Sequence, residues 1–152
     1  MKPMNWKTAF FGFGGRVNRA KYWLVILANI VVWIAFIVLA NILRDSVESF
    51  DGLSRISLLF GISGLTAIAF SLWTGFAVAV KRLHDRARSA WWIVLYWLVP
   101  IALGIAWLYL DDFGGLAVAG VSLAILLWGF VEIALLKGTA GANAYGPDPL
   151  AR

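Results

Sequence analysis

Four long apolar stretches constrain the fold of this chain more than any other feature. They cover approximately residues 22–43, 57–80, 89–110 and 116–136, and Glu132 is the one charged residue within them. A helix rises about 1.5 Å per residue, so about 20 residues cross the ~30 Å hydrocarbon core of a bilayer. The sequence therefore predicts an all-α integral membrane protein, a four-helix bundle formed by a single domain over residues 1–152.

Composition argues against several other classes of protein. The chain is 62% hydrophobic and 14% charged, whereas soluble domains are about half apolar and about 25% charged. Cysteine is absent and there is one histidine, so we expect no disulfide, no metal site and no cofactor. The net charge of +5 is explained better by membrane topology than by a nucleic-acid partner.

Basic residues lie mainly at one end of the predicted helices. They occupy the N-terminal flank, the 81–88 loop and the C-terminal tail, and only Arg44 and Arg55 lie on the other side. Short loops rich in Lys and Arg stay on the cytoplasmic side of a membrane. Both termini are therefore predicted to be cytoplasmic, in a protein that crosses the bilayer several times.

The two ends of the chain are predicted to lie outside the bilayer core. Trp6, Phe10 and Phe13 share one helical face, a spacing typical of a short helix at the membrane surface. The tail, residues 138–152, is rich in glycine and proline and should be irregular. Its polar side chains predict that it folds back onto the 81–88 loop, with Asp148 near Arg82, Arg86 or Arg88. A disordered tail is the alternative. The candidate tail contacts are Asn143, Tyr145 and Asp148.

Two features within the apolar stretches have structural and functional interpretations. Small residues recur at every fourth position of the second stretch, which allows another helix to approach closely. Packing within one chain explains this stripe more simply than a homo-oligomer contact, which stays the alternative. Pro100, near the middle of the third stretch, predicts a kink. The stripe consists of Ser63, Ala67, Ser71, Gly75 and Ala79.

The most charged segment of the chain separates the second and third stretches. It carries four basic residues, the only histidine and a pair of tryptophans. Together with two arginines of the N-terminal flank it could hold an anionic lipid headgroup or a partner protein, since guanidinium groups pair with phosphate in a bidentate manner. The alternative is that these charges only set topology. The candidate residues are Arg16, Arg19, Arg82, His84, Asp85, Arg86, Arg88, Trp91 and Trp92.

Three motifs in order along the chain resemble one family. They are Gly15-Arg16-x-x-Arg19-x-x-Tyr22-Trp23, Arg82-Leu83-His84-Asp85-x-x-x-Ser89-x-Trp91-Trp92, and Gly138-Thr139-x-Gly141-x-Asn143-x-Tyr145-Gly146-x-Asp148-Pro149. This pattern resembles the domain-of-unknown-function family 805, the YhaH-like bacterial inner-membrane proteins. The resemblance implies a small multi-pass protein of the cytoplasmic membrane and brings no established activity or catalytic residue.

The chain departs from that family pattern at two positions. Family members usually show glycine where this chain has Ala87 and Ala90. Because alanine disfavours positive φ, we expect ordinary φ at both positions. The third helix is then predicted to begin near Ala87, with Asp85 as its N-terminal cap.

Three functional hypotheses remain open from the sequence. The favoured one is a non-enzymatic module that binds anionic lipid or a partner protein at its cytoplasmic face. The second is a small oligomeric transporter or channel, in which Glu132 and Asn29 or Asn41 line one cavity. Pairing of Glu132 with the 81–88 loop is the simpler interpretation of that acid. The third hypothesis is a lipid-headgroup enzyme that uses His84 and Asp85 as an acid–base pair.

Overall fold

The computed structural model describes the backbone of residues 11–45 and 50–151, and side chains except those of residues 45–56. Trp6 and Phe10 of the predicted surface helix lie outside this range, and Phe13 is not helical. Contacts group the chain into two compact units, one of Met1–Tyr22 with Ala77–Arg152 and one of Trp23–Phe76. The single domain stays a prediction.

The regular elements of the described chain are helices, and they lie at the four predicted apolar stretches, with a shorter helix at the third. The long helices are α2 (Arg19–Asp45) and α3 (Phe50–Asp85), followed by the π-turn η1 (Val94–Leu98), α4 (Val99–Trp107), α5 (Asp112–Phe130) and the π-turn η2 (Val131–Leu135). Within the described residues, Arg19–Arg44, Ser57–Asp85 and Asp112–Leu135 are long and apolar enough to cross a membrane, and Val94–Trp107 is a shorter apolar helix. These helices confirm the predicted all-α membrane bundle.

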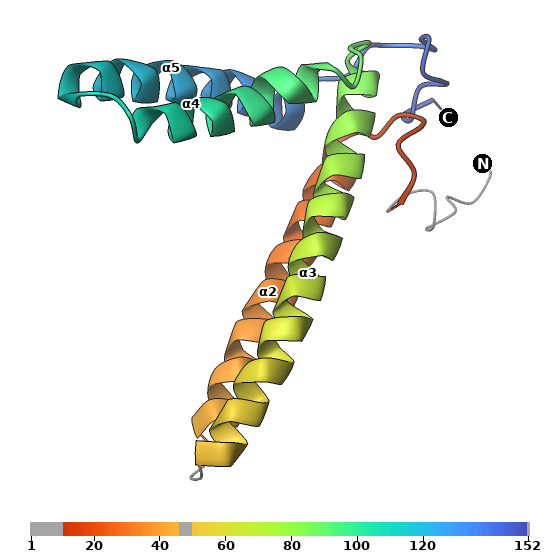
Figure 1. The fold of residues 1–152 in the computed structure, drawn as a ribbon. Coiled ribbons are helices and arrows are strands. Elements are labelled where there is room, and N and C mark those ends of the chain that lie inside the picture. Colours follow the sequence, from red (N-terminus) through yellow and green to blue (C-terminus); the bar gives the residue numbers. More distant parts are fainter. Residues whose placement is uncertain (1–10, 46–49, 152) are drawn as a thin grey trace. The chain divides into compact units, whose positions relative to one another are not determined.

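In the unit of residues 23–76, α2 and α3 lie side by side (Figure 1). The Trp33 indole of α2 donates to the Ser71 hydroxyl of α3 at 3.0 Å. The hydroxyl of Thr74 donates to Asn29 at 3.4 Å. At Ser71 the small-residue stripe thus packs within the chain, as the simpler interpretation predicted. A homo-oligomer contact through the rest of the stripe stays a prediction.

In the other unit, α4 and α5 form a hairpin whose contacts depend on two glycines (Figure 1). A Cβ at Gly129 would come within 2.8 Å of the Tyr96 side chain, and one at Gly115 within 2.5 Å of Trp107. Pro100 has no N–H for an α-helical bond, and η1 lies directly before it, with the Val99 amide bonded to the Val94 carbonyl. The irregularity expected at Pro100 therefore takes the form of a π-turn.

The prediction for the start of the third helix was wrong. Ala87 has a φ of 55°, and α3 continues to Asp85. The Arg88 amide donates to the Leu83 carbonyl at 2.9 Å and the Ala87 amide to the His84 carbonyl at 3.0 Å. This pair of bonds is a Schellman motif, which needs a left-handed residue at its C′ position. Asp85 thus ends α3 instead of capping the next helix, because the Schellman bonds outweigh the strain at Ala87.

Glycine at position 87 should therefore stabilise the protein. A left-handed conformation costs an L-residue about 1–2 kcal/mol, and glycine avoids this cost. The greater entropy of glycine in the unfolded chain offsets part of that gain. We expect Ala87→Gly to raise the free energy of unfolding by about 0.5–1 kcal/mol, measured by denaturation in mild detergent. The control is Ala90→Gly, since φ at Ala90 is not positive. Equal gains at both positions would contradict the strain at Ala87.

Candidate functional site

The last membrane helix ends in backbone carbonyl groups that are held by arginine side chains. A helix leaves its final carbonyls without partners inside the helix, and here Leu136 turns to an extended conformation with ψ 148°. Three arginines supply the missing donors, and their positive charges are favourable at the negative end of a helix. Arg82 donates to Ile133 and Leu136, Arg19 to Leu135 and Arg86 to Lys137.

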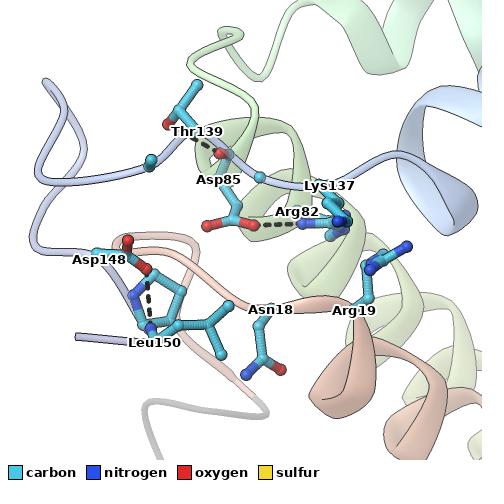
Figure 2. Close-up of a pocket in the computed structure, with 11 residues that line it drawn as sticks. Asn18, Arg19, Arg82, Asp85, Lys137, Thr139, Asp148 and Leu150 are labelled. Carbon is cyan, nitrogen blue, oxygen red and sulfur yellow. Dashed lines mark hydrogen bonds and ion pairs between the residues drawn. The ribbon is translucent and has the colours of Figure 1, made fainter. Parts of the chain in front are cut away.

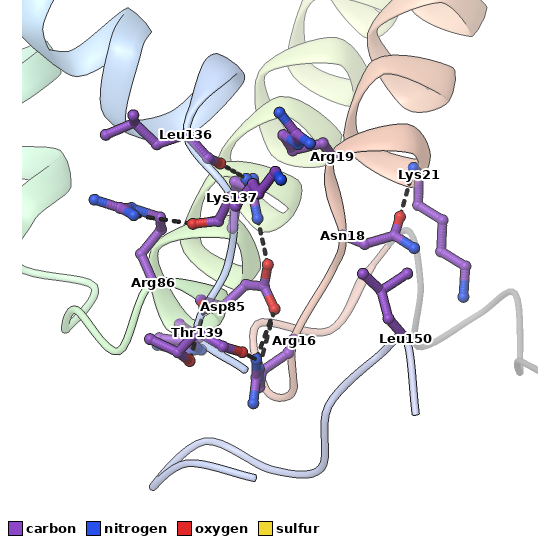
Figure 3. A network of polar contacts seen from close by, with 12 residues as sticks. Arg16, Asn18, Arg19, Lys21, Asp85, Arg86, Leu136, Lys137, Thr139 and Leu150 are labelled. Atoms are coloured by element: carbon purple, nitrogen blue, oxygen red, sulfur yellow. Dashed lines mark hydrogen bonds and ion pairs between the residues drawn. The ribbon is translucent and has the colours of Figure 1, made fainter. Parts of the chain in front are cut away.

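A buried ion triad joins the N-terminal flank to the end of α3 (Figure 3). Asp85 accepts from Arg16 at 3.0 Å through one carboxylate oxygen and from Arg82 through the other. The three side chains are at most 3% exposed. Arg16 also donates to the carbonyls of Thr139 and Gly141, each at 2.6 Å. Two guanidinium groups therefore share one carboxylate, and each of them also donates to backbone carbonyls.

Glu132 lies on η2 and pairs with two arginines of the 81–88 loop. Its carboxylate is 2.9 Å from Arg86 and 3.2 Å from Arg88. The Arg88 guanidinium also lies 4.3 Å above the Trp92 ring, a cation–π contact. This pairing is the simpler interpretation that the sequence offered for Glu132, and it leaves the acid neutralised at the end of the helix.

The tail folds back onto the end of α3, as predicted. The Thr139 amide and hydroxyl both donate to the Asp85 carbonyl, at 2.8 and 3.1 Å. Asn143 donates to the His84 carbonyl at 2.9 Å. The rings of His84 and Tyr145 stack with centroids 4.0 Å apart. The family-like residues of the tail thus make specific contacts with the loop.

Asp148 has other partners than the arginines expected from the sequence. Its carboxylate oxygens accept from the backbone amides of Leu150 at 2.8 Å and Gly141 at 3.0 Å. These amides, with a smaller contribution from Arg16, hold the pKa of Asp148 below its ordinary value. The tail is therefore folded by its own short-range bonds, which charge pairing alone did not reveal.

A cavity of about 300 Å³ lies between the tail, the start of α2 and the end of the last helix (Figure 2). Sequence analysis placed Arg19 and Arg82 in the candidate site but missed Lys137 and Thr139. Among the described residues, the Lys137 ammonium has no hydrogen-bond or ion-pair partner, and Arg19 uses one donor, on Leu135. Charged and polar residues that line the cavity are Asn18, Arg19, Arg82, Asp85, Lys137, Thr139 and Asp148.

Trp91 and His84 do not line this cavity, whereas Asp85 does. Trp91 is 80% exposed, so it is placed to meet lipid. His84 points one ring nitrogen at the Gly15 carbonyl, 3.3 Å away, while both oxygens of Asp85 contact arginines. In this arrangement the imidazole and carboxylate do not form an acid–base pair. No group of three or more potential metal ligands occurs among the described residues.

Comparison with known proteins places most of the chain in one family. A family model described as "Protein of unknown function (DUF805)" matches residues 10–147. The chain is 32% identical over 140 residues to the inner membrane protein YhaH of Escherichia coli K12, covering 92% of this chain and 88% of that protein. It is 31% identical to the inner membrane protein YhaI of the same strain, with 92% and 87% covered. No solved structure matches the chain.

Proposed function

Because this chain belongs to the DUF805 family and is a multi-pass protein of the bacterial inner membrane, we propose that it binds a phosphate-bearing lipid headgroup without catalysis. The site is the cavity of Figure 2, and Arg19 and Lys137 are its phosphate-binding cations. The predicted topology puts this site on the cytoplasmic side. The proposal rests on the Lys137 ammonium, which has no partner among the described residues, and on the Arg19 guanidinium, which uses one donor.

The other arginines of the candidate site already have partners, which leaves fewer cations that could bind a phosphate. Arg16 donates to Asp85 and to three backbone carbonyls, and Arg82 donates to Asp85 and to two. Arg86 and Arg88 share Glu132. The cluster that the sequence singled out thus mainly holds the fold together. Arg19 and Lys137 keep donors that a phosphate could accept from.

The position of the cavity relative to the helix ends also favours an anion. α2 begins at Arg19, and Asn18 caps it by accepting from the Lys21 amide at 2.9 Å. The N-terminus of a helix carries a partial positive charge. Arg19 and Lys21 add two cations in the first turn of α2, which is unfavourable without a nearby anion. The bond from Arg19 to Leu135 joins the first residue of one candidate span to the last residue of another. Lipid headgroups lie at the ends of membrane spans.

Neutralising the two cations should release bound anionic lipid. Each cation near an anionic surface contributes about 1 kcal/mol, so losing two should lower affinity tenfold or more, about 2 kcal/mol. The variant is Arg19→Gln with Lys137→Gln, compared by native mass spectrometry after extraction from membranes that contain phosphatidylglycerol. Lys137→Gln alone should lower retention with little change in stability, since Lys137 has no described side-chain partner.

The control removes one positive charge from the opposite end of α2 and is matched in charge to Lys137→Gln. Arg44→Gln should leave lipid retention unchanged, because Arg44 is in the last turn of that helix. Retention at the wild-type level in the double variant would overturn the proposed function. A loss in Arg44→Gln equal to the loss in Lys137→Gln alone would show that net charge, and not this cavity, attracts lipid.

A further inference from the structure

The headgroup cavity carries both signs of charge, contributed by different segments. Arg19 and Lys137 come from the start of α2 and the end of the last helix, whereas Asp148 comes from the tail. Figure 2 shows Asp148 beside Leu150 and well apart from Arg19 across the view. A ligand with a phosphate alone would leave the Asp148 side of the cavity without a partner.

Asp148 is suited to receive a cation because its carboxylate is held in place and keeps its charge. The Leu150 and Gly141 amides each occupy one oxygen, and every carboxylate oxygen has a further acceptor position. These amides also lower the pKa of the carboxyl group. The positive charge of Arg16 also lowers this pKa, but the N–H donors of Arg16 point to the Asp85 carboxylate and to the carbonyls of Thr139 and Gly141.

We propose that the cavity recognises a zwitterionic headgroup with a phosphate and a primary ammonium, that is, a phosphoethanolamine group. The phosphate lies at Arg19 and Lys137, and the ammonium donates to Asp148. This inference rests on the proposed function and specifies its ligand. The volume of about 300 Å³ is at the lower end for small-ligand sites and suits a headgroup of this size.

The lining of the cavity selects a primary ammonium over a quaternary one. A primary ammonium offers three N–H donors to a carboxylate. A quaternary ammonium offers none and is normally held by the faces of aromatic rings. None of the described residues that line this cavity is aromatic. A choline headgroup should therefore bind no better here than a headgroup without any amine.

The test compares three lipids with identical acyl chains in one nanodisc mixture: phosphatidylethanolamine, phosphatidylglycerol and phosphatidylcholine. Native mass spectrometry of the full chain should show phosphatidylethanolamine enriched about two- to fivefold over the other two, the range expected for one exposed ion pair. Asp148→Asn, which keeps the shape of the side chain, should remove this enrichment. Asp148→Glu, which keeps the charge, should retain part of it.

The control is Asp112→Asn, an equal charge change in the first turn of α5, which should leave the enrichment intact. Soluble glycerophosphoethanolamine at millimolar concentration separates the sources of the ligand, since displacement of lipid would show that the free headgroup suffices. Equal binding of all three lipids by the wild type, or enrichment that survives Asp148→Asn, would overturn this inference. Loss of all lipid in the Arg19→Gln, Lys137→Gln variant would at the same time uphold the proposed function.

Discussion

Gly138→Ala should lower the free energy of unfolding by about 3 kcal/mol, because the new methyl group would collide with the buried ion triad. A Cβ at Gly138 would come within 2.5 Å of Asp85 Cγ and 2.8 Å of its Oδ1, and would overlap with Oδ2. Overpacking of this kind costs about 1–3 kcal/mol. The carboxylate is bonded to Arg16 and Arg82 and cannot move away without losing one of them.

The loss should appear as a lower unfolding midpoint in mild detergent and faster hydrogen exchange in the tail. Gly138 has no positive φ, so the effect would be steric and not conformational. Gly120→Ala is the control, since a Cβ there meets nothing within 4 Å and alanine is the better helix former by about 1 kcal/mol. A Gly138→Ala protein as stable as the wild type would show that the tail does not pack tightly on Asp85.

Local sequence patterns were sufficient to predict the helices and the pairing of Glu132. The length of the apolar stretches indicated where the helices lie, although the third helix is shorter than its stretch. Glu132 is close in the chain to the end of its helix, where basic residues of the neighbouring loop were expected. Pro100 marked the position of an irregularity but not its form, because a missing N–H is compatible with either a kink or a π-turn. Periodicity and charge thus determined most of the fold.

The candidate site was only partly predictable, because its contacts connect residues far apart in the sequence. Arg16 and Asp85 are separated by 69 positions, and the close approach of Gly138 to Asp85 exists only once the tail has docked. The positive φ of Ala87 could not be predicted from its residue type, because turn bonds can hold a non-glycine residue in this conformation. In the sequence Lys137 marks the end of a helix, and its place in the lining of the cavity becomes visible only in the folded chain.

Asp85→Asn should be the most destabilising charge change in the described part of the chain. It leaves the guanidinium groups of Arg16 and Arg82 buried together without a counter-ion, and breaking a buried ion pair costs about 3–5 kcal/mol. The Asp85 carbonyl still accepts from Thr139, so the change isolates the charge. We expect a loss of about 3 kcal/mol, near the lower end of that range, since backbone carbonyls keep part of the arginine bonding.

A double variant separates charge imbalance from the loss of hydrogen bonds. Arg16→Gln destabilises the wild type, but in the Asp85→Asn protein it removes one of two uncompensated cations and should cost about 0.5–3 kcal/mol less. Asp111→Asn is the matched control, because Asp111 caps α5 through the Gly114 amide at 2.8 Å and asparagine caps equally well. Additive losses in the double variant would refute charge imbalance as the cause. Unchanged lipid retention in Asp85→Asn protein that stays folded would assign the triad to folding and leave headgroup binding to Arg19 and Lys137.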